Sequence, residues 1–312
     1  MKIVFAGSPQ FAVPTLAALV AAGYEILAVL TQPDRPVGRE QKLQAPPVKQ
    51  AALRLGLIVH QPEKIRSDPG RALMESLRPD AVVVVGYGQI LPLWLLELPR
   101  YGCINLHASL LPAYRGAAPI QWAVANGETR SGVTTMQMDP GMDTGPMLLM
   151  WETEIGPEET AVALAERLSG PGAELMLQTL AAVEAGRLTP VPQDDSRATK
   201  APLLKKEHGL IDWNMTAQQI FNRLRGFTPW PGIYSGFRGK KMQIWQAKPL
   251  AFADSGSPPG ILLVSKDSLR VVCGEGMLLE ILEVQLEGRR RMSAAEFLRG
   301  APPQPGEVLH LS

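Results

Sequence analysis

Asn105 and His107 are the residues of this chain whose types and spacing best suit catalysis. Both fall in the apolar segment 102–107, which predicts a strand, and residues two apart on a strand point to the same face. An asparagine amide can donate hydrogen bonds to an oxygen that gains negative charge, and a histidine can donate a hydrogen bond or carry a proton near neutral pH. Either residue alone would be more typical of a polar cap at a strand end, so the following segments decide the interpretation.

Two loops rich in glycine and proline follow this strand. Residues 109–119 include Pro112 and Gly116 and predict a shaped loop, because this composition breaks helices and strands. Residues 138–146 lie between two predicted strands and contain Asp139 and Asp143. An aspartate in such a turn often only accepts hydrogen bonds from the backbone of that turn. A structural role is therefore an alternative to a chemical role for both aspartates. Open parallel sheets bind ligands at the carboxyl ends of their strands, where both loops begin.

Cys103 lies two residues before Asn105 and is an alternative, nucleophilic candidate. A cysteine in an apolar strand usually packs as a small hydrophobic residue, and we predict that role here. The chain has one other cysteine, Cys273, and the two have no spacing typical of a disulfide framework or a zinc site. We therefore expect free thiols, no metal, and a cytoplasmic protein.

These candidates must be positioned by the surrounding elements, which alternate between strand-like and helix-like segments. We predict strands at 2–6, 25–30, 80–86, 102–107, 132–138 and 147–154, and helices at 14–22, 48–55 and 159–185. This alternation indicates an α/β domain built on a parallel sheet, and the continuously apolar segment 80–86 fits a central strand that is buried on both faces. Gly186 suits the end of the last helix.

The remainder of the chain predicts a linker and a second, smaller domain. Residues 189–204 are polar and lack apolar periodicity, so we place domain 1–188 before this linker and domain 205–312 after it. One amphipathic helix at 216–225 precedes short strand-like segments at 241–247, 260–264, 269–273 and 277–284, which suggest a small β-barrel.

Charge and hydropathy exclude several classes of protein. The 312 residues are 46% hydrophobic and carry a formal net charge of +1, so no global field favours nucleic acid or membrane, and no apolar segment of about twenty residues is present. The second domain is mildly basic, with 14 Lys and Arg against 10 Asp and Glu, which keeps nucleic-acid binding possible. Neither a GxGxxG nor a GxxxxGK[ST] motif occurs, which disfavours nicotinamide and nucleoside triphosphate enzymes.

The chain resembles the 10-formyltetrahydrofolate-dependent formyltransferases. The resemblance rests on Asn105-Leu106-His107, on Ser109-Leu110-Leu111-Pro112 and on Asp143 in an Asp-Thr-Gly turn. Further segments resemble those members of the family that act on methionine carried by initiator tRNA; they include 5–12, 31–39, 115–121, 211–213, 222–232, 274–276 and 292–294. The resemblance therefore covers nearly the whole chain.

The resemblance implies a Rossmann-like parallel-sheet formyltransferase domain followed by an OB-fold-like β-barrel domain. It implies that Asn105, His107 and Asp143 are catalytic and that Ser109, Leu110, Leu111 and Pro112 line the folate site. The implied reaction transfers a formyl group from 10-formyltetrahydrofolate to the α-amino group of methionyl initiator tRNA. The amine would attack directly through a tetrahedral intermediate, whose oxygen Asn105 and His107 could stabilise. Asp143, if it lies near the imidazole, would favour the protonated ring and help a proton leave the amine.

The resemblance also implies tRNA-binding groups, and the implied protein is a monomer that needs folate but no metal or membrane. Residues 32–47 contain four prolines and predict a mobile surface loop, which in this family approaches the tRNA acceptor end, with Arg39 and Lys42 as positive groups. Glu40 and Gln41 depart from the family pattern and reduce the positive charge of this loop. Arg289, Arg290 and Arg291 suit either phosphate contacts or a solvated turn.

Two alternative functions remain open. A formyltransferase for a small amine, such as an amino-sugar nucleotide, would share the first domain but would not need the second for activity. A non-catalytic folate- or RNA-binding module would tolerate replacement of His107 and Asp143, and the presence of the complete trio argues against it.

Overall fold

A computed structural model describes residues 1–37, 42–253, 256–265 and 268–310. The chain divides into two compact units, and each unit combines segments that are separate in sequence. The first unit consists of Met1–Pro119, Arg130–Glu154 and Ala163–Pro202, and the second of Ile120–Thr129, Ile155–Val162 and the residues from Leu203 onward.

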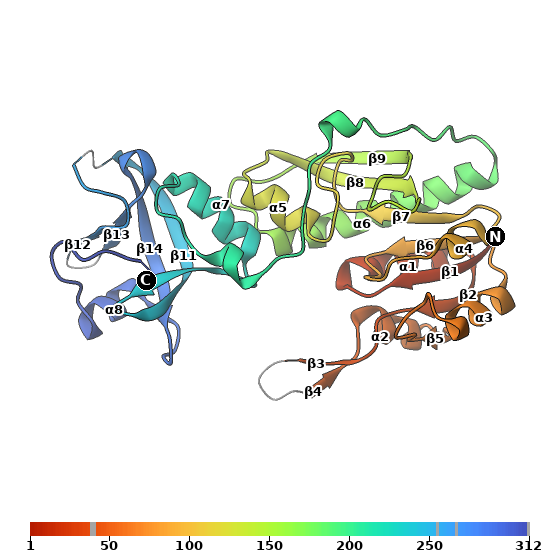
Figure 1. The fold of residues 1–312 in the computed structure, drawn as a ribbon, viewed down its shortest axis with the longest axis horizontal. Coiled ribbons are helices and arrows are strands. Elements are labelled where there is room, and N and C mark those ends of the chain that lie inside the picture. Colours follow the sequence, from red (N-terminus) through yellow and green to blue (C-terminus); the bar gives the residue numbers. More distant parts are fainter. Residues whose placement is uncertain (38–41, 254–255, 266–267, 311–312) are drawn as a thin grey trace. The chain divides into compact units, whose positions relative to one another are not determined.

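The first unit is built on a seven-stranded sheet with the order β5-β2-β1-β6-β7-β8-β9 (Figure 1). The strands in this order are β5 (Val59–His60), β2 (Glu25–Leu30), β1 (Lys2–Gly7), β6 (Ala81–Val85), β7 (Cys103–His107), β8 (Arg130–Gln137) and β9 (Met147–Glu154). The five strands from β5 to β7 pair in parallel, as predicted, with β6 buried along its whole length. The prediction of a parallel sheet is wrong for β8 and β9, which pair antiparallel. Residues 138–146 connect β8 to β9, and this loop is shorter than the crossover of a dozen or more residues that joins two parallel strands.

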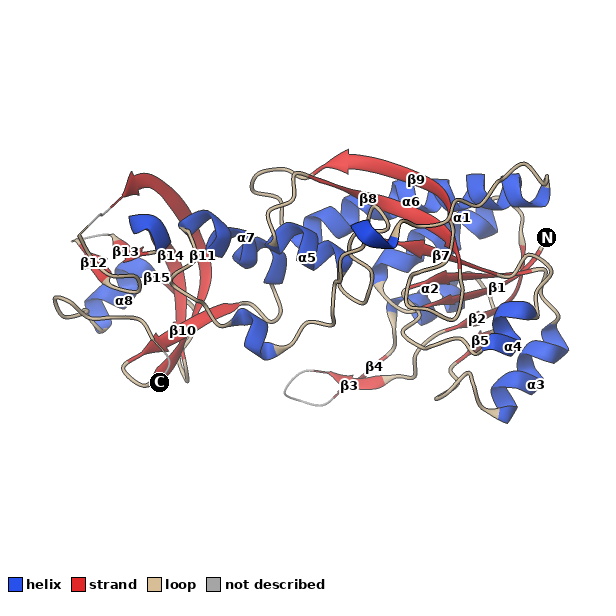
Figure 2. Ribbon diagram, turned by 45° about the horizontal axis from the view of Figure 1, so that its top comes forward, coloured by secondary structure: helices blue, strands red, loops and turns tan. Residues whose placement is uncertain are grey.

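Helices accompany this sheet (Figure 2). They are α1 (Val13–Ala21), α2 (Pro47–Arg54), α3 (Asp68–Leu77), α4 (Leu93–Glu97) and α6 (Ala161–Glu184), with short 3₁₀ turns at η1 (Gln10–Ala12) and η2 (Asp195–Arg197). The structure adds α3 and α4 to the predicted helices. Gly186 follows α6 with φ of 64°, the left-handed conformation expected after a helix end. No helix among the described residues is long and apolar enough to cross a membrane.

Alternation along β7 explains the position of the candidate residues. Leu106 points to the α6 face, where it lies 3.0 Å from the Cβ position of Gly172. Cys103 points to the opposite face, into an apolar core that includes Met74 of α3 and Leu95 of α4. Asn105 and His107 share the face of Cys103 but lie nearer the carboxyl end of the strand.

The second unit contains an antiparallel sheet with the order β10-β11-β14-β13-β12, and β15 pairs with β14. Its elements are α5 (Pro119–Ala125), η3 (Lys206–Gly209), α7 (Ala217–Phe227), β10 (Ile233–Phe237), β11 (Lys240–Ala253), β12 (Leu262–Val264), β13 (Leu269–Val272), η4 (Gly274–Gly276), β14 (Met277–Leu286), β15 (Met292–Ser293) and α8 (Ala294–Gly300). Thr216 caps α7 and forms a capping box with Gln219. The rings of Phe237 and Phe297 pack edge to face in the core, with centroids 5.2 Å apart.

The observed division differs from the predicted domains 1–188 and 205–312 in two respects. Residues 120–129 and 155–162 belong to the second unit although they lie inside the first predicted domain. Most of the predicted linker, 189–204, belongs to the first unit, since residues as far as Pro202 are part of it. Main-chain hydrogen bonds attach this segment, for example between Met147 and Val191, and bonds of this kind leave no hydrophobic pattern in a sequence.

Candidate active site

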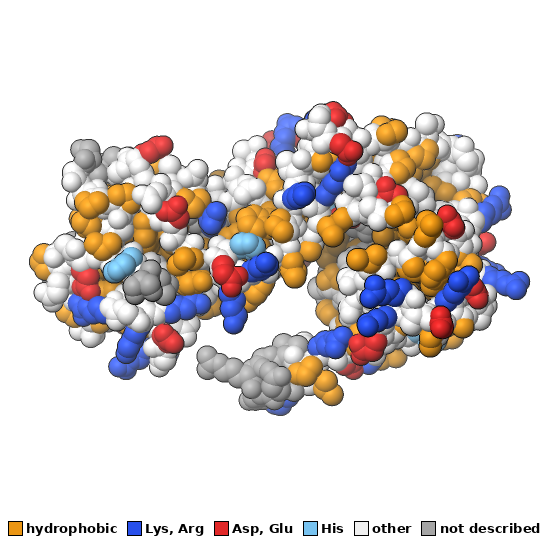
Figure 3. Space-filling view, viewed as in Figure 1, with side chains coloured by type: hydrophobic (Ala, Val, Ile, Leu, Met, Phe, Trp, Pro, Cys, Tyr) orange, Lys and Arg blue, Asp and Glu red, His pale blue; other side chains and the backbone are white. Residues whose placement is uncertain are grey.

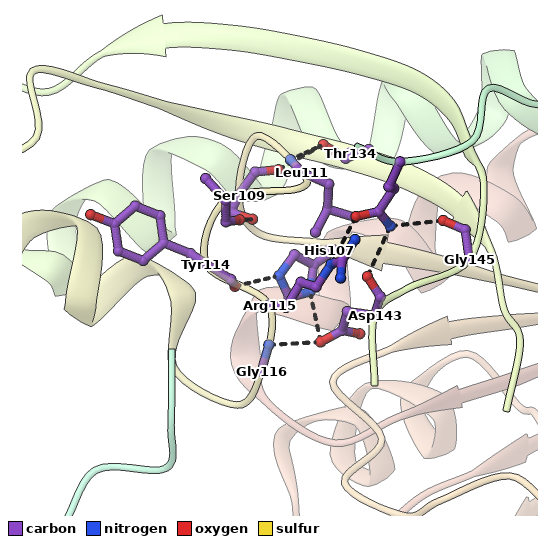
Figure 4. A network of polar contacts seen from close by, with 11 residues as sticks. His107, Ser109, Leu111, Tyr114, Arg115, Gly116, Thr134, Asp143 and Gly145 are labelled. Carbon is purple, nitrogen blue, oxygen red and sulfur yellow. Dashed lines mark hydrogen bonds and ion pairs between the residues drawn. The ribbon is translucent and has the colours of Figure 1, made fainter. Parts of the chain in front are cut away.

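His107 lies at the carboxyl end of β7 between two loops, and only 6% of its surface is exposed (Figure 4). Its Nε2 lies 2.9 Å from the main-chain oxygen of Tyr114. A carbonyl oxygen only accepts hydrogen bonds, so Nε2 carries a hydrogen and donates it. The other ring nitrogen, Nδ1, lies 3.7 Å from Oδ2 of Asp143. The tautomer of the neutral ring is thereby fixed, and Nδ1 is the nitrogen that can accept a proton next to a carboxylate.

Asp143 comes from the β8–β9 turn and reaches across to the loop that follows β7. Its Oδ2 accepts a hydrogen bond of 2.8 Å from the main-chain N–H of Gly116. The backbone of Asp143 is left-handed, with φ of 55°, which is uncommon outside glycine. Asp139 is different, because among the described residues its carboxylate accepts only from its own turn, from the Gly141 N–H and the Thr144 hydroxyl. The Asp139 carboxylate therefore bonds within its turn, as is usual in such turns, whereas the Asp143 carboxylate lies beside the His107 ring.

Asn105 shares the strand face of His107 and is 7% exposed. Its side-chain amide makes no hydrogen bond to the described part of the chain. A nearly buried amide without a protein partner retains its full capacity to donate to a bound molecule. The structure thus brings the three residues predicted to be catalytic, Asn105, His107 and Asp143, to one edge of the sheet.

The segment 109–112 forms a tight loop that hydrogen bonds connect to its own chain and to β8. The Ser109 hydroxyl donates to the Ala113 carbonyl over 2.6 Å, and the Leu111 N–H donates to the Thr134 hydroxyl over 3.2 Å. Ser109 and Leu111 are buried, whereas Leu110 and Pro112 are partly exposed. Of the four residues predicted to line the folate site, the side chains of Leu110 and Pro112 are therefore the more accessible.

Cys103 is fully buried, and its thiol lies 3.4 Å from the main-chain oxygen of Leu95. Burial raises the pKa of the Cys103 thiol to about 12. A thiol of this kind is almost entirely protonated at neutral pH, and the thiolate is the nucleophilic form. The packing role predicted for Cys103 agrees with this position.

Residues that sequence reasoning missed hold the two loops together. Tyr114 and Gly116 contact the side chains of His107 and Asp143 through main-chain atoms, which no side-chain motif reveals. Gln193 contacts the Asp143 turn and Arg115 from within the predicted linker. The glycine and proline content of 109–119 was the one sequence signal for Tyr114 and Gly116. No sequence signal indicated Gln193.

The predicted tRNA-binding residues lie in several environments. Arg39, Glu40 and Gln41 fall outside the described residues. Lys42 begins β4 (Lys42–Gln44), which pairs antiparallel with β3 (Arg35–Val37), so the predicted structureless loop contains a hairpin. The hairpin base is held by Lys49, whose amine hydrogen-bonds the Asp34 carboxylate and lowers its pKa.

The three arginines of the second unit differ in their partners. Arg290 pairs with Glu296 over 2.7 Å, and Arg291 pairs with Glu283. Arg291 also lies over the ring of Trp245, with its guanidinium carbon 5.1 Å from the centroid. Arg289 is exposed and has no side-chain partner among the described residues. Figure 3 shows Lys and Arg side chains interspersed with Asp and Glu over the visible face of this unit.

No cluster of His, Cys, Asp and Glu within the described ranges could hold a metal ion. The titratable groups at the site are instead one imidazole and one carboxylate. Such a set can exchange protons and stabilise charge.

Comparison with known proteins identifies relatives along the whole chain. The model of the formyl transferase family matches residues 1–180, and that of the formyl transferase C-terminal domain matches residues 203–302. The methionyl-tRNA formyltransferase of Solibacter usitatus is 55% identical over 300 residues, and that of Acidobacterium capsulatum is 54% identical over 301 residues, each covering 96% of both chains.

Solved structures resemble the chain in fold. A sugar 3N-formyl transferase aligns with a TM-score of 0.67 and 16% identity, covering 93% of this chain and 99% of its own. HypX from Aquifex aeolicus, in complex with tetrahydrofolic acid, aligns with a TM-score of 0.63 and 16% identity, covering 100% of this chain and 51% of its own. The α/β formyltransferase fold of the first unit and the presence of a further C-terminal domain agree with these comparisons.

Proposed function

The chain belongs to the methionyl-tRNA formyltransferases of the formyl transferase family, and from that premise we propose how its own residues carry out the reaction. It transfers a formyl group to the α-amino group of methionine on the initiator tRNA, for translation initiation. The donor in this family is formyl-tetrahydrofolate, which supplies the formyl group on its N10 nitrogen. The observation that carries the proposal is the placement of His107 between the Tyr114 carbonyl and the Asp143 carboxylate, on the same strand face as the unpartnered Asn105 amide.

His107 holds and moves a proton at Nδ1. Its Nε2 hydrogen is committed to Tyr114, so proton exchange at the ring takes place at the nitrogen that faces Asp143. At 3.7 Å the pair is longer than a hydrogen bond, and such a contact can tighten in the substrate complex.

Asn105 stabilises the oxygen of the formyl group when the amine nitrogen attacks the formyl carbon. The C=O bond becomes a C–O⁻ bond in the tetrahedral intermediate, and the Asn105 amide donates a hydrogen bond to that oxygen. The amine loses one proton and the departing N10 gains one, so the enzyme needs only to accept a proton and return it. Asp143 and His107 Nδ1 together suffice for that transfer, and no covalent enzyme intermediate forms.

Folate binding is proposed for the loop 109–112, with Leu110 and Pro112 as its accessible side chains. The bond from Ser109 to Ala113 and the bond from Leu111 to Thr134 of β8 support this proposal, because they fix the loop shape before the ligand arrives. A rigid wall of this kind costs little conformational entropy on binding.

tRNA binding is proposed for Arg39, Lys42, Arg289, Arg290 and Arg291, acting on phosphate groups. We further propose that the C-terminal sheet is an OB-fold-like barrel. The continuous pairing of the long β11 with β10 and with β14, and the register shifts along it, support a strongly curved sheet. We propose that the protein acts as a cytoplasmic monomer without a metal.

A formyl-transfer assay tests the function directly. The purified enzyme with 10-formyltetrahydrofolate should formylate methionyl initiator tRNA and should leave free methionine and amino-sugar nucleotides unmodified. Formylation of an amino-sugar nucleotide at a comparable rate would overturn the assignment of the acceptor.

A further inference from the structure

The segment 193–201, which the sequence predicts as linker, contacts both loops of the active site. The Gln193 side-chain amide donates two hydrogen bonds, to the main-chain oxygens of Asp143 and Gly145, over 2.8 Å and 2.7 Å. Its side-chain oxygen accepts from Nε of Arg115 over 2.9 Å. One side chain therefore connects the turn that carries Asp143 with the loop that follows β7.

A second set of bonds attaches the same segment to that loop. The Tyr114 N–H donates to the Thr199 hydroxyl over 2.8 Å, and the Arg115 N–H donates to the Thr199 carbonyl over 2.9 Å. The Ala201 N–H donates to the Arg115 carbonyl over 2.7 Å. These bonds hold the residues on either side of Arg115, namely Tyr114, which binds His107, and Gly116, which binds Asp143.

The backbone of Asp143 needs such support. Its left-handed backbone, with φ of 55°, is a conformation that a non-glycine residue keeps only where its surroundings hold it. Gln193 fills this role because an amide group offers two donors and an acceptor at once, which matches two carbonyl oxygens on one side and a guanidinium on the other.

We propose that Gln193 is a positioning residue for catalysis, which holds Asp143 at its place beside His107. The proposal rests on the catalytic role proposed above for Asp143. Gln193 itself contacts no reacting atom, and it acts through the main chain of the turn. A shift of the carboxylate by about 1 Å can reduce a rate about 100-fold, so the loss of Gln193 should be visible in turnover.

The test compares two substitutions at this position with a neighbouring control. Gln193→Glu keeps the size of the side chain and an acceptor for Arg115, but it replaces the donor group with a carboxylate that repels the two carbonyl oxygens. Gln193→Ala removes all three bonds. Asp194→Asn is the control, because the Asp194 carboxylate bonds only Ser196 among the described residues. Each variant is measured for kcat, for KM with charged tRNA, for folate binding and for its unfolding temperature.

We expect both Gln193 substitutions to lower kcat about 10- to 100-fold, with KM for charged tRNA within about twofold of the original and folate binding retained. In a double-mutant cycle with Asp143→Asn, the Gln193 substitutions should cause little further loss, because the group that they displace is already absent. A kcat of Gln193→Glu within twofold of the original, or equal losses in both backgrounds, would overturn the positioning role.

The cycle also separates this proposal from the one on which it rests. If Asp143→Asn alone has normal kcat, the catalytic role of Asp143 is wrong, and the positioning role falls with it. If Asp143→Asn is impaired while Gln193→Glu behaves like Asp194→Asn, only the positioning role is wrong.

Discussion

His107 donates its Nε2 hydrogen to the main-chain carbonyl of Tyr114 across 2.9 Å. This bond assigns separate tasks to the two ring nitrogens. Nε2 fixes the orientation of the ring, and Nδ1 faces the carboxylate of Asp143 at 3.7 Å. The acceptor is a main-chain atom, so substitution of the Tyr114 side chain leaves it in place.

Replacement of His107 or Asn105 should therefore impair chemistry more than binding. For Asn105→Ala we expect kcat to fall by about 10²–10³, the cost typical of losing one donor to a developing oxyanion, and for His107→Ala by about 10²–10⁴, the contribution typical of general acid–base catalysis. The dissociation constant for charged tRNA should stay within about twofold, because neither residue is among those proposed to bind it. Single-turnover rates and filter binding measure the two quantities separately. Near-normal turnover in either variant would contradict the mechanism.

Gly116 should tolerate no side chain. Its φ of 125° is rare for other residues, and a Cβ there would lie 2.6 Å from the main-chain oxygen of Ala201. Gly116→Ala should displace the N–H that binds Asp143 and lower kcat about 10-fold or more, and the unfolding temperature should fall with it.

Gly23→Ala is the matched control for Gly116→Ala. Gly23 also has positive φ, at 80°, but no atom lies within 4 Å of its Cβ position. It should lose some stability through backbone strain and keep its kcat. Equal kcat values for the two variants would show that backbone strain, and not the Gly116 N–H, explains any effect.

These positions show what a sequence can predict of this site. Asn105 and His107 were predictable because a strand places alternate side chains on one face, and Asp143 because a family motif contains it. The same regularity predicted most strands of the first unit, and the apolar segment 80–86 correctly predicted β6 as a buried central strand.

Contacts made by main-chain atoms were not predictable in the same way. The Tyr114 carbonyl, the Gly116 N–H and the bonds of residues 193–201 depend on loop conformation, and loop conformation has no period. The antiparallel pairing of β8 and β9 was missed for a related reason, since the hydrophobic pattern of a strand does not indicate whether it pairs parallel or antiparallel with its neighbour. The helix α4 has only five residues, and short apolar segments fit helix and strand equally well.

Cys103 should be chemically inert in the native enzyme. Burial raises the pKa of both thiols, Cys103 and Cys273, to about 12, so at pH 8 only about one thiol in ten thousand is ionised. Reaction with a thiol reagent at pH 8 should label neither cysteine until denaturant is added, and then both. Cys103→Ala should keep kcat within about twofold and lose about 1 kcal/mol of unfolding free energy through the small cavity that it leaves. Rapid native labelling of Cys103 with parallel loss of activity would restore the thiol as a catalytic candidate.

The arginines at 289–291 should differ in their effect on the salt dependence of tRNA binding. Arg289 has no side-chain partner among the described residues, so Arg289→Gln should reduce the slope of log K against log salt by about 1, as for the loss of one phosphate contact. Arg290 and Arg291 are already paired with Glu296 and Glu283, and these pairs offset part of their charge. Their replacement should change the slope less and weaken binding mainly by leaving a carboxylate unpaired near the RNA backbone.

Arg71→Gln provides the control for this series, because Arg71 is an exposed arginine of α3 that pairs with Glu75 and is not assigned to RNA binding. It removes the same charge from the protein and should leave the slope unchanged. Equal slopes for Arg289→Gln and Arg71→Gln would exclude phosphate contact by Arg289 and favour a solvated turn at 289–291. A reduced slope for Arg289→Gln alone would instead identify this turn as part of the tRNA-binding surface, since counterion release depends on where a charge meets phosphate as well as on net charge.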